Sequence, residues 1–422
     1  MNLALNLPLF IAFRIGFNAR FYYPIISVFF IDLGLTLEQY TLLNLVWALT
    51  IVTCELPSGA LADLVGRRTL VRAAATLMVV EMLVLLLAPA SSSWLFPVLL
   101  LNRLLSGLAE ACASGADEAL AFDSLPPGPD RDPHWARTLA TLGRCQSASF
   151  LLVMLIGAAA YDPALVGTSG GSPSRWPIAL TLLMALTAAS ASWAMREPPR
   201  HALPSSPWLL RPWRQIVETS RWIAHTPTVL ALLASGLALD SVIRLFLTLQ
   251  SNFLRMLGYA EGWFGALAAG FSLVAFLTPA LARRLVHSLP PVANFILAAI
   301  LALLAFLLIS APNRFLATLA LAPLAAAMSL NNFFIAYYLN RAADSTHRAT
   351  LLSFRGMAYN LAFGFVALAY AAAVASLRQL THFPDENATF RAALPLFPLL
   401  FLALITLAIH FGWRARPRPK RS

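Results

Sequence analysis

Long apolar runs separated by short polar breaks make up almost the whole chain. A helix that crosses the hydrocarbon core of a bilayer needs about 20 mostly apolar residues, and twelve runs meet this criterion. Their approximate cores are residues 9–31, 39–62, 70–90, 95–122, 138–160, 176–195, 228–254, 260–282, 290–311, 315–340, 349–376 and 392–413. The pattern therefore predicts an all-α membrane protein with twelve transmembrane helices.

The longest polar break lies between the sixth and seventh runs. Its first part is rich in proline, and its second part, residues 213–224, mixes tryptophan and aliphatic residues with charged ones, as is typical of an amphipathic helix at a membrane surface. We therefore expect three regions: an N-terminal six-helix bundle (1–195), a cytoplasmic linker with an amphipathic helix (196–227), and a C-terminal six-helix bundle with a basic cytoplasmic tail (228–422).

An internal repeat favours two pseudo-symmetric halves. Sliding the chain by 224 residues places Arg20 on Arg244 and Gly34 on Gly258. Repeats of this kind are common in membrane transporters, where the two halves enclose a site near the bilayer midplane. The first and seventh helices are therefore expected to be equivalent, and each presents a cation.

Composition agrees with a membrane location. The chain of 422 residues is 59% hydrophobic and only 12% charged, with a mean hydropathy of +0.72, so it has too little polar surface for a water-soluble globule. Its net charge of +11 would suggest nucleic acid as a partner in a soluble protein. Here the charges lie mostly in the polar breaks, which points to membrane topology instead, and we expect no nucleic-acid partner.

The basic residues are concentrated in every second polar break and in the tail. Positive residues favour the cytoplasmic side of a membrane, so we expect a multi-pass protein of the cell (inner or plasma) membrane with both termini cytoplasmic. Cys54, Cys112 and Cys145 show no Cys-x-x-Cys spacing, which argues against a metal site or a disulfide framework. No His-Glu-x-x-His motif and no Cys/His cluster is present, so an enzyme is not expected.

A charged stretch joins the second and third runs, with Gly59, Asp63, Gly66, Arg67 and Arg68 at fixed spacing. It resembles the loop between helices 2 and 3 of the major facilitator superfamily, Gly-x-Leu-x-Asp-x-x-Gly-Arg-Arg/Lys, at every fixed position. The resemblance extends over essentially the whole chain and implies two six-helix bundles that rock about a central site. We call this stretch, residues 59–68, the signature loop.

The resemblance also implies a gate role for Asp63. In the family this aspartate holds one side of the two halves together, near the start of helix 11 and beside an acidic residue at the inner end of helix 4. The matching positions here are Arg348, in Arg-Ala-Thr-Leu-Leu-Ser-Phe, and Asp123, in Phe-Asp-Ser-Leu. The alternative is that Asp63 and the two arginines only enforce membrane topology.

The fourth run is unusually charged for a membrane helix, with Arg103, Glu110, Asp117, Glu118 and Asp123. Ionisable groups at membrane depth are costly and normally face a cavity or a partner. At about 100° per residue, the first four lie on one stripe and Asp123 lies opposite. The segment from Arg103 also resembles the superfamily's Arg-x-x-x-Gly motif, whose arginine is often tied to proton coupling. An ion-pair network that only braces the helices is the alternative.

Charged residues in other runs are further candidates for the cavity. Asp240 and Arg244 are four residues apart, the spacing of an ion pair along one helix face. In the first run Arg20 is preferred to Arg14 as the cavity residue, and Glu81 in the third run is a candidate for proton binding unless an arginine partner makes it structural. Lesser candidates are Glu55, Arg144, Gln146, Asn331, Asn332, Tyr337, Arg355 and Asn360.

We therefore expect a secondary active transporter of a small organic solute that works by alternating access. The embedded carboxylates favour proton coupling, with a proton gradient and no cofactor as the driving force, and export is preferred to import. A solute importer or uniporter of the same fold, and a non-transporting sensor or scaffold, are the alternatives. Its partners are expected to be the solute and the lipid bilayer, and the protein is expected to be a monomer.

Overall fold

The computed structural model describes residue 3 and residues 5–167, 173–198, 211–311, 313–342 and 348–414; within these ranges the side chains of residues 56, 60, 63, 211–216, 219, 348–350, 352–353 and 411–414 are not described. The chain divides into two compact units. Unit 1 comprises Met1–Pro212 and Ala260–Ala266, and unit 2 comprises Trp213–Tyr259 and Leu267–Ser422. The first boundary between the two units, after Pro212, lies within the predicted linker, residues 196–227. The division into two bundles and a linker stays a prediction.

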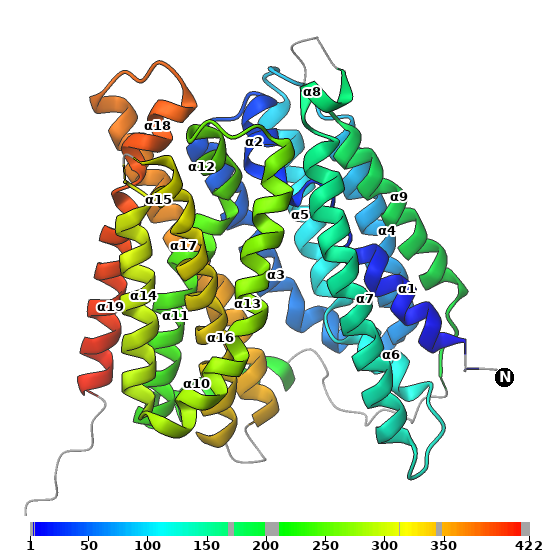
Figure 1. Ribbon diagram of the computed structural model, residues 1–422. Coiled ribbons are helices and arrows are strands. Elements are labelled where there is room, and N and C mark those ends of the chain that lie inside the picture. Colours follow the sequence, from blue (N-terminus) through cyan, green and yellow to red (C-terminus); the bar gives the residue numbers. More distant parts are fainter. Residues whose placement is uncertain are drawn as a thin grey trace, which may run out of the picture. The chain divides into compact units, whose positions relative to one another are not determined.

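Unit 1 is built from helices that correspond to the first six apolar runs (Figure 1). They are α1 (Asn6–Asn18), the short helix η1 (Tyr23–Ile25), α2 (Ile26–Asp32), α3 (Leu37–Val65), α4 (Arg67–Leu86), α5 (Leu95–Ala113), α6 (Ala116–Asp123), α7 (Arg131–Ala159), α8 (Pro163–Val166) and α9 (Trp176–Ala194). α5 packs against both α3 and α4, and α9 packs against α1 and α4. Buried phenylalanines fill the core near α1 and α2, including Phe13, Phe17 and Phe30.

Unit 2 is described from residue 213 onward and is again helical. Its part of the chain contains α10 (Arg211–His225), α11 (Pro227–Thr248), α12 (Gln250–Met256), α13 (Gly262–Ser288), α14 (Pro291–Leu308), α15 (Arg314–Leu319), α16 (Leu321–Ala342), α17 (Arg348–Leu380), α18 (Glu386–Ala393) and α19 (Leu396–Arg414). α11 is the central element, because it contacts α14, α16, α17 and α19. Phe246 of α11 packs edge-on against Phe306 and Phe397 of two of these neighbours.

Ten helical stretches of the described chain are long and apolar enough to cross a membrane. They coincide with ten of the twelve runs, and the other two are 9–31 and 39–62. The run 39–62 forms the continuous helix α3 of 29 residues. The run 9–31 is divided between α1 and α2, so neither piece reaches the required length. All twelve runs are therefore helical, as expected, and five of them are interrupted.

Five helices are interrupted where the sequence predicted continuous runs. The first breaks between Asn18 and Tyr23, the fourth at Gly115, whose φ of 74° is left-handed, and the seventh at Leu249. The tenth breaks at Ala320, and the twelfth between Ala393 and Leu396. At the first break α7 passes so close that a Cβ on Gly157 would collide with the carbonyl of Phe21. Only glycine allows this approach, and it puts the break at the level where the charged side chains of unit 1 meet.

Candidate functional site

Arg20 lies in the break of the first helix and is enclosed by unit 1. The N–H of the next residue, Phe21, donates to Oγ1 of Thr181 at 3.0 Å, which fixes the unwound backbone. The guanidinium Nη1 of Arg20 donates to both carboxylate oxygens of Glu81, at 3.0 and 3.1 Å, and Nη2 donates to Oε1 of Glu110 at 3.2 Å. One buried cation is therefore shared by two carboxylates from α4 and α5.

The two carboxylates differ in their access to solvent. The side chain of Glu81 is fully buried, whereas that of Glu110 is 32% exposed. Asn102 of α5 also donates to the backbone carbonyl of Glu81 at 2.9 Å, which fixes α4 against α5 at this level. Glu81 is thus the enclosed counter-ion of Arg20, and Glu110 is the partly exposed member of the triad.

Arg103 is separate from this triad. Its residue exposure is 5%, and its guanidinium lies over the ring of Phe30, 4.8 Å from the centroid. Among the residues that the structure describes, none accepts a hydrogen bond from its Nε or Nη2. A cation–π contact partly compensates for a missing carboxylate. The structure therefore places Arg103 in the core of unit 1 on an aromatic face, without an ion pair to the described residues.

The other two acidic residues of the predicted stripe belong to a second ion-pair group. Asp117 accepts an ion pair from Nε of Arg14 at 3.2 Å, and Glu118 accepts from Nη2 of the same arginine at 2.6 Å. The prediction of one continuous stripe from Arg103 to Glu118 was wrong, because the turn at Gly115 changes the helical phase between α5 and α6. The fourth apolar run, which forms α5 and α6, therefore supplies carboxylates to two arginines: Glu110 to Arg20, and Asp117 and Glu118 to Arg14.

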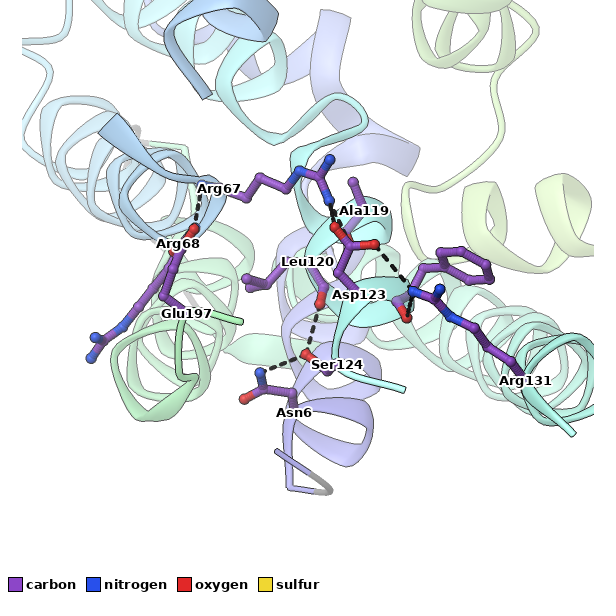
Figure 2. Close-up of polar contacts among 10 residues, drawn as sticks. Asn6, Arg67, Arg68, Ala119, Leu120, Asp123, Ser124, Arg131 and Glu197 are labelled. Atoms are coloured by element: carbon purple, nitrogen blue, oxygen red, sulfur yellow. Dashed lines mark hydrogen bonds and ion pairs between the residues drawn. The ribbon is translucent and has the colours of Figure 1, made fainter. Parts of the chain in front are cut away.

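The signature loop forms the turn between α3 and α4, with Gly66 at a φ of 106°. Arg67 forms an ion pair with Asp123, and its Nη1 also donates to the carbonyl of Ala119 at 3.1 Å. Asp123 also forms an ion pair with Arg131 at 3.2 Å (Figure 2). The carboxylate of Asp123 therefore joins the start of α4 to the start of α7.

Glu197 also contacts this turn, and sequence reasoning missed it. Its two carboxylate oxygens accept the backbone N–H groups of Arg67 and Arg68, at 3.1 and 2.9 Å (Figure 2). The first N–H groups of a helix lack intrahelical partners and carry partial positive charge, so this carboxylate caps α4. The signal in the sequence is an acidic residue directly after the sixth run and before two prolines.

Asn6 holds the neighbouring residue Arg196 in place. The amide of Asn6 donates to the carbonyl of Arg196 at 2.7 Å and accepts from its N–H at 2.9 Å. It also donates to Oγ of Ser124 at 2.8 Å. The chain that leaves α9 is therefore fixed to the starts of α1 and α4 and to the end of α6.

Two residues of the predicted gate lie outside the described side chains. Asp63 is in the last turn of α3 and Arg348 is the first residue of α17, but the side chain of neither is described. Gly59 lies within α3, where a Cβ would meet no atom within 4 Å. The docking of Asp63 near helix 11 stays a prediction.

Unit 2 contains a smaller ion pair at the repeat-equivalent position. Nη2 of Arg244 lies 2.6 Å from Oδ2 of Asp240, at the predicted spacing of four residues. Nη1 of Arg244 donates to Oδ1 of Asn360 on α17 at 3.0 Å, and the guanidinium lies over the ring of Phe363. The side chain of Arg244 is 26% exposed, whereas that of Asp240 is 1% exposed.

Polar groups of α16 and α17 lie close to this pair. Asn331 donates to the carbonyl of Gly236 at 3.1 Å. A Cβ on Gly236 would collide with the hydroxyl of Tyr359, so glycine is what lets the tyrosine reach α11. The hydroxyl of Tyr359 is buried and has no hydrogen-bond partner among the described residues.

The comparisons with known proteins agree with this architecture. The family model described as Major Facilitator Superfamily matches residues 9–367. The solved structure of the nucleoside transporter NupG is 11% identical, covers 97% of this chain and 99% of its own, and has a TM-score of 0.70. No curated protein gives a significant sequence match.

Two further solved structures are similar in fold. A bacterial homologue of the human lysosomal transporter Spinster, in an inward-facing and unoccupied conformation, has a TM-score of 0.68 at 17% identity over 99% of this chain and 98% of its own. A D-xylose–proton symporter has a TM-score of 0.66 at 16% identity, with the same coverage of 99% and 98%.

The apolar helices and the charged groups held between them define a multi-pass membrane transporter of small solutes, not an enzyme. The chain belongs to the major facilitator superfamily.

Proposed function

We propose that this protein is a proton-coupled secondary active transporter of a small organic solute, with Glu110 as the residue that binds the proton. The observation that carries the proposal is the sharing of Arg20 between a fully buried and a partly exposed carboxylate. When Glu110 is charged, the triad has one excess negative charge. When it is protonated, Arg20 and Glu81 form a neutral pair.

Neutralising a buried group lowers the cost of closing the protein around it, because charge at membrane depth is expensive. Protonation of Glu110 therefore favours the state in which the triad is shut off from solution. The other charges that face Glu110 are Arg20, Glu81 and the more distant Arg14. Asp117 is a second candidate for proton binding, but both it and Glu118 are held by Arg14.

The test is solute flux in proteoliposomes loaded with a pH-sensitive dye and exposed to a broad solute panel, with and without an imposed proton gradient. For a transported solute we expect the gradient to drive accumulation and solute movement to change the internal pH. Glu110→Gln and Asp117→Asn are expected to alter the pH dependence more than Asp123→Asn, whose carboxylate lies at the signature loop. Equal effects of all three would contradict the assignment.

We further propose export as the direction of net transport, in a cell membrane, by a monomer with both termini cytoplasmic. The distribution of basic residues in the sequence supports this orientation. In the same liposomes, export by proton exchange acidifies the interior as solute leaves, whereas cotransport makes the interior more alkaline. A protein that changes neither solute nor proton content across the panel would be a sensor or scaffold of the same fold.

A further inference from the structure

In unit 2, positive charges outnumber negative ones around Asp240. Arg244 forms an ion pair with this carboxylate at 2.6 Å. Arg355 of α17 is also close enough to act on it electrostatically. In the described part of the chain, no acidic residue is among the groups whose charges act on Asp240. Two guanidinium groups therefore lie near one carboxylate, and one positive charge remains uncompensated by the described residues.

The partners of the two arginines show where this surplus lies. Arg244 uses Nη2 for Asp240 and Nη1 for Asn360. Arg355 is partly exposed and makes no hydrogen bond or ion pair to any side chain that the structure describes. An arginine presents five N–H donors in a fixed fork that matches a carboxylate or a phosphate. Arg355 therefore places free donors beside Asp240.

Tyr359 supplies a further free donor. It is 7% exposed, its hydroxyl lies near the amide of Asn331 without a well-formed hydrogen bond to any described residue, and it interacts electrostatically with Asp240, Arg244 and Arg355. A buried hydroxyl without a well-formed hydrogen bond is unfavourable. Its presence one turn of α17 from Arg355 adds an uncharged donor to the cationic group.

Arg103 of unit 1 lacks a described ion-pair partner too, but its surroundings differ. It is almost fully buried and lies on the ring of Phe30. Arg244 and Arg355 are partly exposed. A solute can therefore approach the arginines of unit 2, whereas Arg103 is covered by its own bundle.

We propose that Asp240, Arg244, Arg355, Tyr359 and Asn360, here called the Asp240 cluster, bind an anionic group of the transported solute, either a carboxylate or a phosphate. This inference rests on the proposed transport function and names its substrate class. The anion pairs with Arg355 and the exposed edge of Arg244, and the hydroxyl of Tyr359 donates to it. Asp240 keeps Arg244 oriented and repels the anion from the deeper side.

The pairing removes the surplus charge from the membrane interior, where an uncompensated cation is costly. Charge-assisted hydrogen bonds to a guanidinium are also among the strongest in proteins. The same surplus repels a cationic solute. The Asp240 cluster therefore selects organic anions over neutral and cationic compounds of the same size.

The test is binding of simple anions to the full-length protein in detergent, at constant ionic strength maintained with sodium chloride. The probes are benzoate and succinate for carboxylates and inorganic phosphate for phosphates, with choline and glucose as cationic and neutral references. Thermal unfolding and tryptophan fluorescence report binding. We expect at least one anion to raise the unfolding temperature in a saturable way, and the responding class identifies the acidic group.

Arg355→Gln is expected to raise the half-saturating concentration of that anion at least tenfold, Tyr359→Phe several-fold, and Arg355→Lys less than Arg355→Gln. Arg314→Gln is the matched control, because Arg314 lies on the ring of Tyr259 away from the cluster and its loss leaves binding unchanged. Absence of stabilisation by every carboxylate and phosphate, undiminished binding by Arg355→Gln, or stabilisation by choline would overturn the proposal.

This experiment is independent of proton coupling. Binding in detergent needs neither flux nor a gradient, so an anion that binds without proton-driven flux would leave the Asp240 cluster intact and contradict the proposed function. Proton-driven flux of a neutral or cationic solute would support the proposed function and contradict anion binding by the Asp240 cluster.

Discussion

Arg20 and Arg244 occupy equivalent positions of the internal repeat, yet their surroundings differ. Arg20 is enclosed, lies in unwound backbone and is shared by two carboxylates from other helices. Arg244 is partly exposed, lies in the regular part of α11 and pairs with one carboxylate of that helix. The comparison supports the proposal that the two cation positions serve different tasks. In unit 1 the excess negative charge suits proton binding, and in unit 2 the excess positive charge suits an anionic solute.

The largest effect is expected from removing the buried carboxylate in each unit. Glu81→Gln leaves the enclosed Arg20 with only Glu110, and breaking a buried pair costs about 3–5 kcal/mol. Asp240→Asn is expected to cost less than half as much, because Arg244 is partly exposed and keeps Asn360. Thermal and denaturant unfolding in detergent measure both. Equal losses would show that the two arginines have equivalent surroundings.

A second contrast concerns the two glycines that allow close approach. In Gly157→Ala the new Cβ meets the backbone carbonyl of Phe21, which cannot move without displacing Arg20. In Gly236→Ala it meets the ends of two side chains, Tyr359 and Ile335. Overpacking costs about 1–3 kcal/mol, and we expect Gly157→Ala at or above the upper end and Gly236→Ala near the lower end.

The loss of stability is measured as a shift in the unfolding midpoint. Adding Tyr359→Phe to Gly236→Ala removes the nearest clashing atom and is expected to restore part of the loss. No double variant of this kind rescues Gly157→Ala. A larger loss for Gly236→Ala than for Gly157→Ala would contradict the view that the rigid backbone at Phe21 makes the contact in unit 1 less tolerant than the side-chain contact in unit 2.

The smallest effect is expected at the starts of two helices, α4 in unit 1 and α14 in unit 2. Glu197 caps α4, whereas α14 begins at Pro291 and has no side-chain cap. Loss of a cap costs about 1 kcal/mol, so Glu197→Ala is expected to lower stability by about that amount. Asn294→Ala, near the start of α14, tests whether unit 2 has a comparable brace, and Glu218→Ala serves as an exposed control. An unchanged unfolding midpoint for Glu197→Ala would show that the cap of α4 by Glu197 does not contribute to stability.

The sequence was sufficient for the fold because each helix carries its own apolar signal. It also located both repeat arginines and the Asp240–Arg244 pair, whose spacing is local. It could not assign the partners of Arg20, since Glu81 and Glu110 come from other helices and are brought to it only by packing. The interruption at Gly115 made the assumption of one regular helix invalid for Asp117 and Glu118. The Ser114-Gly115 pair was a visible signal of this interruption in the sequence.

The cap by Glu197 was missed for a different reason. Sequence reasoning looked for a carboxylate on the signature loop itself and assigned Asp63, whose side chain lies outside the described residues. The carboxylate that the structure places on the start of α4 instead comes from the chain after α9. Contacts between segments more than a hundred residues apart leave no local pattern, so this one required the structure.

The most direct test of the central claim is proton-driven solute accumulation by Glu110→Gln, compared with Glu118→Gln. Glu118 is on the same helical run but is 48% exposed and paired with Arg14. We predict that Glu110→Gln loses at least about 90% of gradient-driven accumulation, because a neutral amide cannot carry a proton. Downhill solute exchange is retained, and Glu118→Gln stays close to the original protein. Full proton-driven accumulation by Glu110→Gln would contradict the account.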